Sequence, residues 1–136
     1  MSITIMLISD KENLIEFGVH QLLKWKIRII DEQIQLFDNK NCLILTIEKY
    51  GNDSDLIDEY MEITSDFLDE FKAGLKKAFF YAIHYSFQQG VLGILKAIAE
   101  DYDLWFDFCD NKLCEDFILR SHEILEMEDS EIIKLL

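Results

Sequence analysis

The chain has 136 residues, half of them apolar and 12% aromatic, and its 13 basic and 27 acidic side chains give a formal net charge of −14. This length predicts one domain, residues 1–136, and the aromatic content excludes a disordered acidic tail, because such tails lack the apolar residues needed for a core. The negative charge argues against nucleic-acid and anionic-membrane partners, which recruit basic residues, and favours a basic protein partner.

Cysteine usage and the absence of a targeting signal predict a cytoplasmic location. Cys42, Cys109 and Cys114 are an odd number without the spacing of a disulfide framework. The first residues show no basic segment followed by an apolar one, as a secretory signal would. No apolar run reaches the length that a transmembrane helix needs.

The first third of the chain predicts mainly strands. The isoleucine-rich run 2–8 is typical of a buried strand, and Ser9 with Glu12 has the spacing of a capping box, which predicts a helix over 10–25. Three further strands, separated by two polar turns, are expected at 27–30, 33–37 and 42–48. Polar and apolar residues alternate in these strands, so one face of the small sheet should be wet.

A long amphipathic helix is expected after the break at Gly51–Ser54. From Leu56 to Phe71 apolar residues recur at three- and four-residue steps, and acids fill the other side. Like charges at this spacing cost a helix about 0.3 kcal/mol per pair, so the acidic face either keeps the protein soluble or binds something positive. Its candidate partner-binding residues are Asp58, Glu59, Glu62, Asp66, Asp69 and Glu70.

The second half of the chain predicts mostly helices. The aromatic run 78–87 favours a strand by composition, but continuation of the preceding helix favours more helix, and we expect helix. Helices are also expected at 88–101 and 114–125, a strand at 104–108, and a loose C-terminal end whose isoleucines could still dock. The fold class is therefore α+β, with a small antiparallel sheet from the N-terminal third packed against several helices from the C-terminal two-thirds.

The sequence shows no catalytic signature. His20, His84 and His122 lie at no zinc-site spacing from a cysteine or from one another, and no glycine-rich phosphate loop is present. The many carboxylates look alike and solvated, whereas acid–base catalysis needs two carboxylates in different environments. We therefore expect a protein that is not an enzyme and that binds neither a metal nor a cofactor.

An aromatic residue among acids marks a second candidate surface. Trp105 lies between Asp103 and Asp107, and tryptophan is enriched at the energetic centres of interfaces, although a buried structural role is an alternative. The candidate partner-binding residues of this surface are Asp103, Trp105, Asp107, Asp110, Glu115 and Asp116.

This second surface also carries a resemblance. The stretch Asp103–Asp110, DLWFDFCD, and the acidic segment Glu115–Ile118 that follows are similar to aromatic–acidic segments near the C-termini of several bacterial immunity proteins. The whole chain resembles, in type, the small immunity proteins of contact-dependent growth inhibition and polymorphic toxin systems, without assignment to one family. The resemblance implies a cytoplasmic inhibitor that forms a tight complex with the C-terminal domain of a cognate toxin, often a basic nuclease.

Three other functions stay open at this point. An acidic interaction module that mimics nucleic acid would bind many basic enzymes rather than one. A small-ligand protein or enzyme with its site in the segment 79–87 would show a pocket in which His84 meets a carboxylate. A structural subunit would carry its acids only for solubility.

Overall fold

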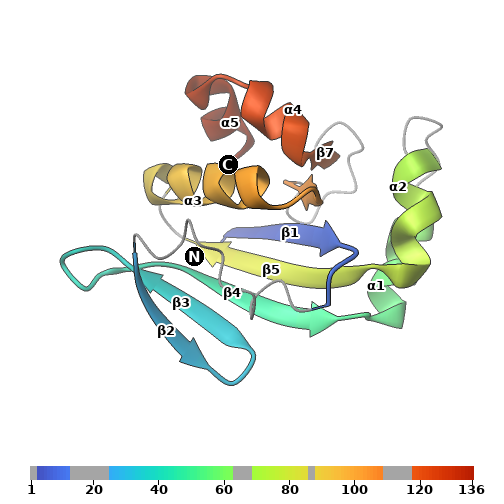
Figure 1. Cartoon of the computed structure of the whole chain (residues 1–136), viewed down its shortest axis with the longest axis horizontal. Helices are drawn as coiled ribbons and strands as arrows, with labels where there is room; N and C mark the ends of the chain where they lie inside the picture. Colours follow the sequence, from blue (N-terminus) through green and yellow to red (C-terminus); the bar gives the residue numbers. More distant parts are fainter. Residues whose placement is uncertain (1–2, 13–24, 63–68, 86–87, 109–117) are drawn as a thin grey trace.

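A computed structural model describes residues 3–12, 25–62, 69–85, 88–108 and 118–136 (Figure 1). Its centre is a seven-stranded sheet in the order β2-β3-β4-β5-β1-β6-β7, in which every neighbouring pair is antiparallel. The strands are β1 Ile3–Ser9, β2 Lys26–Ile30, β3 Gln33–Phe37, β4 Leu43–Gly51, β5 Phe79–Tyr85, β6 Trp105–Asp107 and β7 Ile118–Arg120. The helices are α1 Ser54–Met61, α2 Asp69–Gly74, the 3₁₀ turn η3 Leu75–Lys77, α3 Gln88–Asp101, α4 Ser121–Glu126 and α5 Asp129–Leu135.

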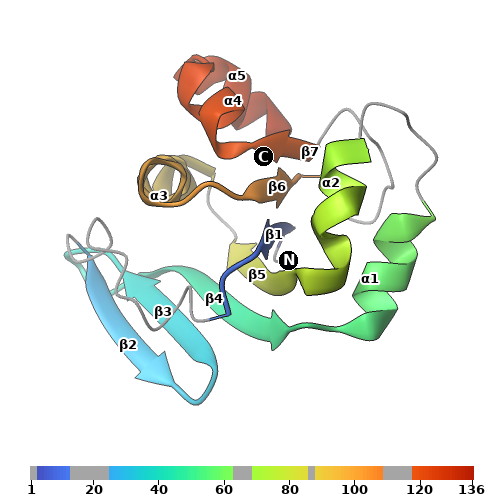
Figure 2. The same ribbon diagram turned by 45° about the vertical axis from the view of Figure 1, so that its right-hand side comes forward.

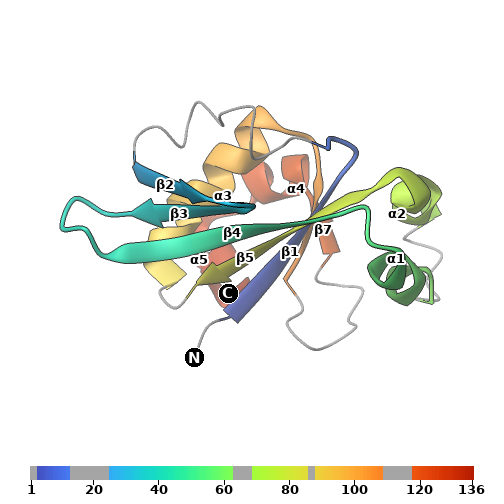
Figure 3. The same ribbon diagram turned by 90° about the horizontal axis from the view of Figure 1, so that it is seen from below.

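The expected α+β class is confirmed. Helices α3, α4 and α5 cover one face of the sheet, whereas α1 and α2 lie together at one end of the molecule (Figures 1 and 3). The sheet is larger than expected, because β5, β6 and β7 from the C-terminal two-thirds of the chain extend it. Among the described residues, no helix is long and apolar enough to cross a membrane.

Two hydrophobic cores lie on the two faces of the sheet. Successive side chains of a strand point to opposite faces, so Leu7 belongs to the larger core under α3 and Ile8 to the smaller core under α1 and α2. In the smaller core Tyr60 of α1 and Phe71 of α2 pack against Phe80 of β5. This second core is the reason that the acidic helices take a fixed place on the sheet.

The helix expected over 78–87 was wrong. Phe79–Tyr85 is strand β5, which pairs with β4 on one side and with β1 on the other. Only such a central position buries both faces of a strand, and Phe80, Tyr81, Ala82 and Ile83 are all completely buried. The strand conformation of this segment depends on pairing with strands that are distant in sequence, and the local pattern of residues gives no information about those partners.

The C-terminal expectations were partly wrong. Ile118–Arg120, expected inside a helix over 114–125, is strand β7 on the edge of the sheet, and α4 begins only at Ser121. The chain end is not loose: α5 docks through Ile132, which is completely buried, and the Tyr85 hydroxyl donates a 3.0 Å hydrogen bond to the Leu136 carbonyl.

The remaining expected elements are confirmed within one or two residues where the structure describes them. This holds for β1, β2, β3, β6 and α3, whereas β4, expected over 42–48, runs three residues further, to Gly51. Alternating burial of β3 gives the expected wet face. The helix expected over 10–25 falls almost entirely outside the described residues. Asp53 caps the first acidic helix, with its side chain accepting from the N–H groups of Asp55 and Leu56.

Candidate functional site

The single long helix expected over the acidic stretch was wrong: α1 ends at the C-cap Glu62, and α2 is a separate helix that lies beside it. The rings of Tyr60 in α1 and Phe71 in α2 meet edge to face, with their centroids 5.6 Å apart, and Figures 1 and 2 show both helices at the same end of the molecule. Four exposed carboxylates of this stretch take part in no ion pair within the described part of the chain. We call the set the α1–α2 acidic surface: Asp58, Glu59, Glu62 and Asp69. Asp66 falls outside the described residues.

Trp105 is anchored rather than free. It lies on β6 with its ring centroid 5.3 Å from that of Phe71, in an edge-to-face contact, and it is half-buried. Its cross-strand neighbour on β7 is Arg120, whose guanidinium carbon lies 5.0 Å from the centre of the Trp105 ring. This distance is within the range of a cation–π interaction.

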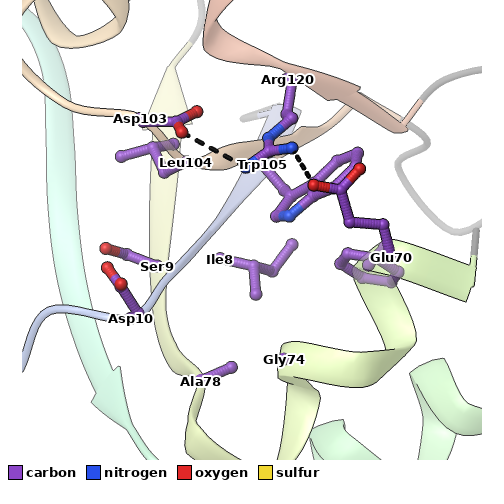
Figure 4. A pocket seen from close by; sticks show the side chains of 11 residues that line it. Ile8, Ser9, Asp10, Glu70, Gly74, Ala78, Asp103, Leu104, Trp105 and Arg120 are labelled. Carbon is purple, nitrogen blue, oxygen red and sulfur yellow. Dashed lines mark hydrogen bonds and ion pairs between the residues drawn. The ribbon is translucent and has the colours of Figure 1, made fainter.

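Arg120 brings the two predicted acidic surfaces together. One guanidinium nitrogen pairs with Glu70 of α2, and the other lies 3.2 Å from Oδ2 of Asp103, just before β6 (Figure 4). Arg120 thus joins Asp103 to Glu70, which lies 50 positions before the arginine in the chain. Both carboxylates are solvent-exposed, so these pairs are screened and each adds little to stability.

The backbone around Arg120 is fixed by its neighbours. Arg120 is the last residue of β7 and the N-cap of α4, and its N–H donates to Oε1 of Glu123 at 3.1 Å. Ser121, almost fully buried, accepts from the Leu104 N–H at 3.0 Å and donates to the Tyr102 carbonyl at 2.5 Å. These bonds hold the Asp103 segment next to the start of α4, which places Asp103 within reach of Arg120.

A cavity of about 210 Å³ opens between α2 and β6, and we call it the Trp105 pocket. Its floor is apolar: Ile8, Phe71, Ala78, Leu104 and Trp105. Its charged rim is Asp10, Glu70, Asp103 and Arg120 (Figure 4). Three carboxylates and one guanidinium leave two net negative charges around an apolar floor.

Asp107 does not belong to any exposed surface. It lies two residues after Trp105 on β6, so both side chains point to the α1–α2 side of the sheet. There α1 covers Asp107, which is 9% exposed, and the Tyr60 hydroxyl donates to its Oδ2 at 2.6 Å. Asp107 is therefore left out of the candidate interface, and Asp110, Glu115 and Asp116 fall outside the described residues.

A row of polar side chains surrounds His84 on the sheet face that also carries the smaller core. Nδ1 of His84 lies 3.0 Å from the Thr4 hydroxyl and Nε2 lies 3.1 Å from Oε2 of Glu48, on the strands to either side of β5. The histidine–carboxylate pair that the enzyme alternative requires is thus present. His84 does not line the cavities next to Trp105, Tyr102 and Leu119.

The neighbourhood of Glu48 also alters one tyrosine. Burial, the negative charge of Glu48 and a 3.3 Å hydrogen bond from the Tyr50 hydroxyl to Glu48 together raise the pKa of Tyr50 above its usual 10.0. Within the described residues, no group of three or more His, Cys, Asp or Glu side chains is arranged to hold a metal ion.

Sequence reasoning missed Arg120 as the centre of the site. The available signal was a single arginine in the strongly acidic C-terminal segment. Its partners lie on α2 and before β6, and only the folded chain brings them to it.

Comparisons of the chain with protein-family models, with curated proteins and with solved structures found no match. The function is therefore inferred from the geometry and the charges of the described residues.

Proposed function

We propose that this protein is a cytoplasmic immunity protein, without enzymatic activity, that binds and neutralises a basic toxin domain of the nuclease type. The observation that carries the proposal is that the α1–α2 acidic surface and the Trp105 pocket lie together: Glu70 of α2 is part of the pocket rim, and Asp69 stands next to it. The immunity-protein resemblance of the Asp103–Asp110 segment supports the same function.

Electrostatics explain why such a surface suits an inhibitor. An enzyme that cleaves nucleic acid is cationic where the phosphates bind, so a fixed group of carboxylates is attracted to that region. The attraction raises the association rate and disfavours acidic partners. One helix carries the exposed carboxylates Asp58, Glu59 and Glu62, and the contact of Tyr60 with Phe71 holds this helix in place. Because its backbone is already ordered before a partner binds, little backbone entropy is lost on binding.

The Trp105 pocket gives this surface a point of specificity. A lysine or arginine side chain of the partner could lay its aliphatic stem on Phe71 and Trp105 and direct its charged end to Asp10 or Asp103. A pocket that accepts one side chain distinguishes a dedicated partner from basic proteins in general.

The experiment is an affinity capture from the source cells with three tagged proteins. The first is the wild type, and the second carries Asp58→Lys and Glu59→Lys on α1. The third carries Glu32→Lys and Glu126→Lys, which change the net charge equally at exposed positions on the β2–β3 turn and the end of α4. Each capture is washed at low and then at high salt, and the retained proteins are identified and tested for growth arrest when produced alone.

The proposal expects one basic protein that survives high salt on the wild type and on the third protein but is lost from the second. That protein should stop growth alone and become harmless when co-produced with the wild type. Many basic proteins that leave with salt would indicate a nucleic-acid mimic. Equal retention by all three proteins would remove the α1–α2 acidic surface from the interface.

A further inference from the structure

The strand β2 is an edge of the sheet with an unusual composition. Among the strands that the structure describes, it pairs with β3 alone, and all five of its residues are exposed. Three of them are isoleucines, and Ile29 exposes 67% of its surface. Natural edge strands are normally blunted by charges or covered, because an exposed apolar edge pairs readily with another strand. The two charges of β2, Lys26 and Arg28, lie on one face of the strand, so the face with Ile27 and Ile29 carries no charge.

The free backbone groups of β2 can be assigned from its hairpin. A two-residue turn, Asp31–Glu32, joins β2 to β3, so the flanking pair Ile30 and Gln33 is hydrogen-bonded. Hydrogen-bonded and non-hydrogen-bonded pairs alternate along an antiparallel ladder. The N–H and C=O groups of Ile27 and Ile29 therefore point away from β3, towards the open edge.

The charges at this edge fit a second copy of the same chain. Lys26 and Arg28 on β2 are balanced by Asp31 and Glu32 in the turn, so the hairpin is neutral in a chain of net charge −14. Figures 1 and 3 show the hairpin and the acidic helices in opposite halves of the molecule. Two copies that meet edge to edge thus keep their acidic surfaces apart.

We propose that β2 pairs antiparallel with β2 of a second copy, around a two-fold axis at Arg28, to form a homodimer with a continuous sheet. In this register Ile27 lies opposite Ile29 of the copy, and Ile29 lies opposite Ile27 of the copy. The outward N–H and C=O groups of these two residues therefore form hydrogen bonds between the two copies. Ile27 and Ile29 share the sheet face of the buried Leu36 and Ile34, so the paired isoleucines extend the larger core. Arg28 faces Arg28 of the copy on the other face, and this like-charge pair weakens the dimer.

The test measures molar mass by sedimentation equilibrium from about 1 μM to about 1 mM protein at low and at high salt. The wild type should dimerise, and more strongly at high salt, since salt screens both the Arg28 pair and the net charge. Ile29→Lys should abolish the dimer, because it places a lysine at the apolar contact. Leu125→Lys, a change at a 43% exposed residue of α4, should leave the dimer intact.

A third variant tests the register. Arg28→Thr removes the like-charge pair and places two threonines opposite each other, so it should strengthen dimerisation at low salt several-fold. A wild type that stays monomeric at every concentration and salt overturns the proposal. So does an Ile29→Lys protein that keeps the wild-type mass but loses a captured partner, which would assign the edge to a partner's strand.

Discussion

The phenol oxygen of Tyr60 on α1 donates a 2.6 Å hydrogen bond to Oδ2 of Asp107 on β6, and both residues are buried. The same Tyr60 ring stacks on Phe80 at a centroid distance of 5.8 Å and meets Phe71 edge to face. One side chain thus ties the first acidic helix to the sheet through a polar contact and two aromatic contacts. The position of the α1–α2 acidic surface depends on it.

Replacing Tyr60 by phenylalanine should lower the free energy of unfolding by about 1–3 kcal/mol, because the buried Asp107 carboxylate loses one donor. Urea unfolding monitored by tryptophan fluorescence measures the change. Tyr50→Phe is the matched control: Tyr50 is 41% exposed and its 3.3 Å bond to Glu48 is solvated, so a change below about 0.5 kcal/mol is expected. Equal effects of the two variants would contradict the role of the buried pair.

Arg120→Gln should speed association with the basic partner. The change frees Glu70 and Asp103 and makes the Trp105 pocket more negative, so the attraction at short range grows. The cost in stability should be only about 1 kcal/mol, from screened ion pairs and the contact with Trp105. Stopped-flow mixing with the captured partner measures the rate.

The control for Arg120→Gln is Lys96→Gln. It changes the net charge equally, but it breaks a pair with Asp129 between α3 and α5, away from the pocket. A smaller rate increase is expected there. Equal increases would show that total charge governs the rate, and a decrease for Arg120→Gln would show that the arginine itself contacts the partner.

The two glycines of α3 should respond oppositely to alanine. A Cβ at Gly93 would lie 3.7 Å from Cζ2 of Trp25, an ordinary contact, so Gly93→Ala should stabilise the protein by about 0.5–1 kcal/mol. A Cβ at Gly90 would lie 2.9 Å from Cγ2 of Ile44, which is too close, so Gly90→Ala should destabilise it. Thermal unfolding of both variants compares them. A Gly90→Ala protein as stable as Gly93→Ala would contradict the close packing of α3 on β4.

Tyr50 should ionise at higher pH than a free tyrosine, because partial burial of its side chain raises its pKa first and Glu48 raises it second. As the pH rises, Tyr50 loses its proton in the unfolded chain before it does so in the folded protein, because its pKa is higher in the folded state. The contribution of Tyr50 to stability is therefore complete below pH 10.0, and it is lost as the pH rises through the pKa of Tyr50 in the folded protein. Glu48→Gln should shift the Tyr50 pKa back towards 10.0 without fully restoring it. Phenolate absorbance of the wild type, Glu48→Gln and Tyr50→Phe resolves this one group, and an unchanged titration in Glu48→Gln would contradict the role of the carboxylate.

Local patterns predicted the elements whose identity depends on neighbours in the chain. The isoleucine run of β1 and the hairpin turn at Asp31–Glu32 are encoded within a few residues, and the structure confirms them. The run 79–85 was misjudged because a strand buried on both faces shows no alternation. Its partners in β1 and β4 lie more than 25 residues away in sequence, beyond the reach of any local pattern.

The candidate site was likewise predictable in part from the sequence. Composition alone predicted that the acids of 50–71 and the segment around Trp105 matter for binding, since excess like charge and an aromatic among acids are visible in any sequence. It could not distinguish Asp107 from Asp103, two acids that flank one tryptophan at equal spacing. The start of β6 leaves Asp103 at the rim of the pocket, whereas α1 covers Asp107.

The sequence by itself determined the α+β class, the negative charge and its two locations, because these follow from residue type and short-range spacing. Only the tertiary structure decided that the two acidic segments converge on Arg120, that Asp107 is buried and that β2 is left as an open edge. The physical reason is that burial and pairing depend on which distant elements share a face of the sheet, and chain folding sets that arrangement across 50 residues or more.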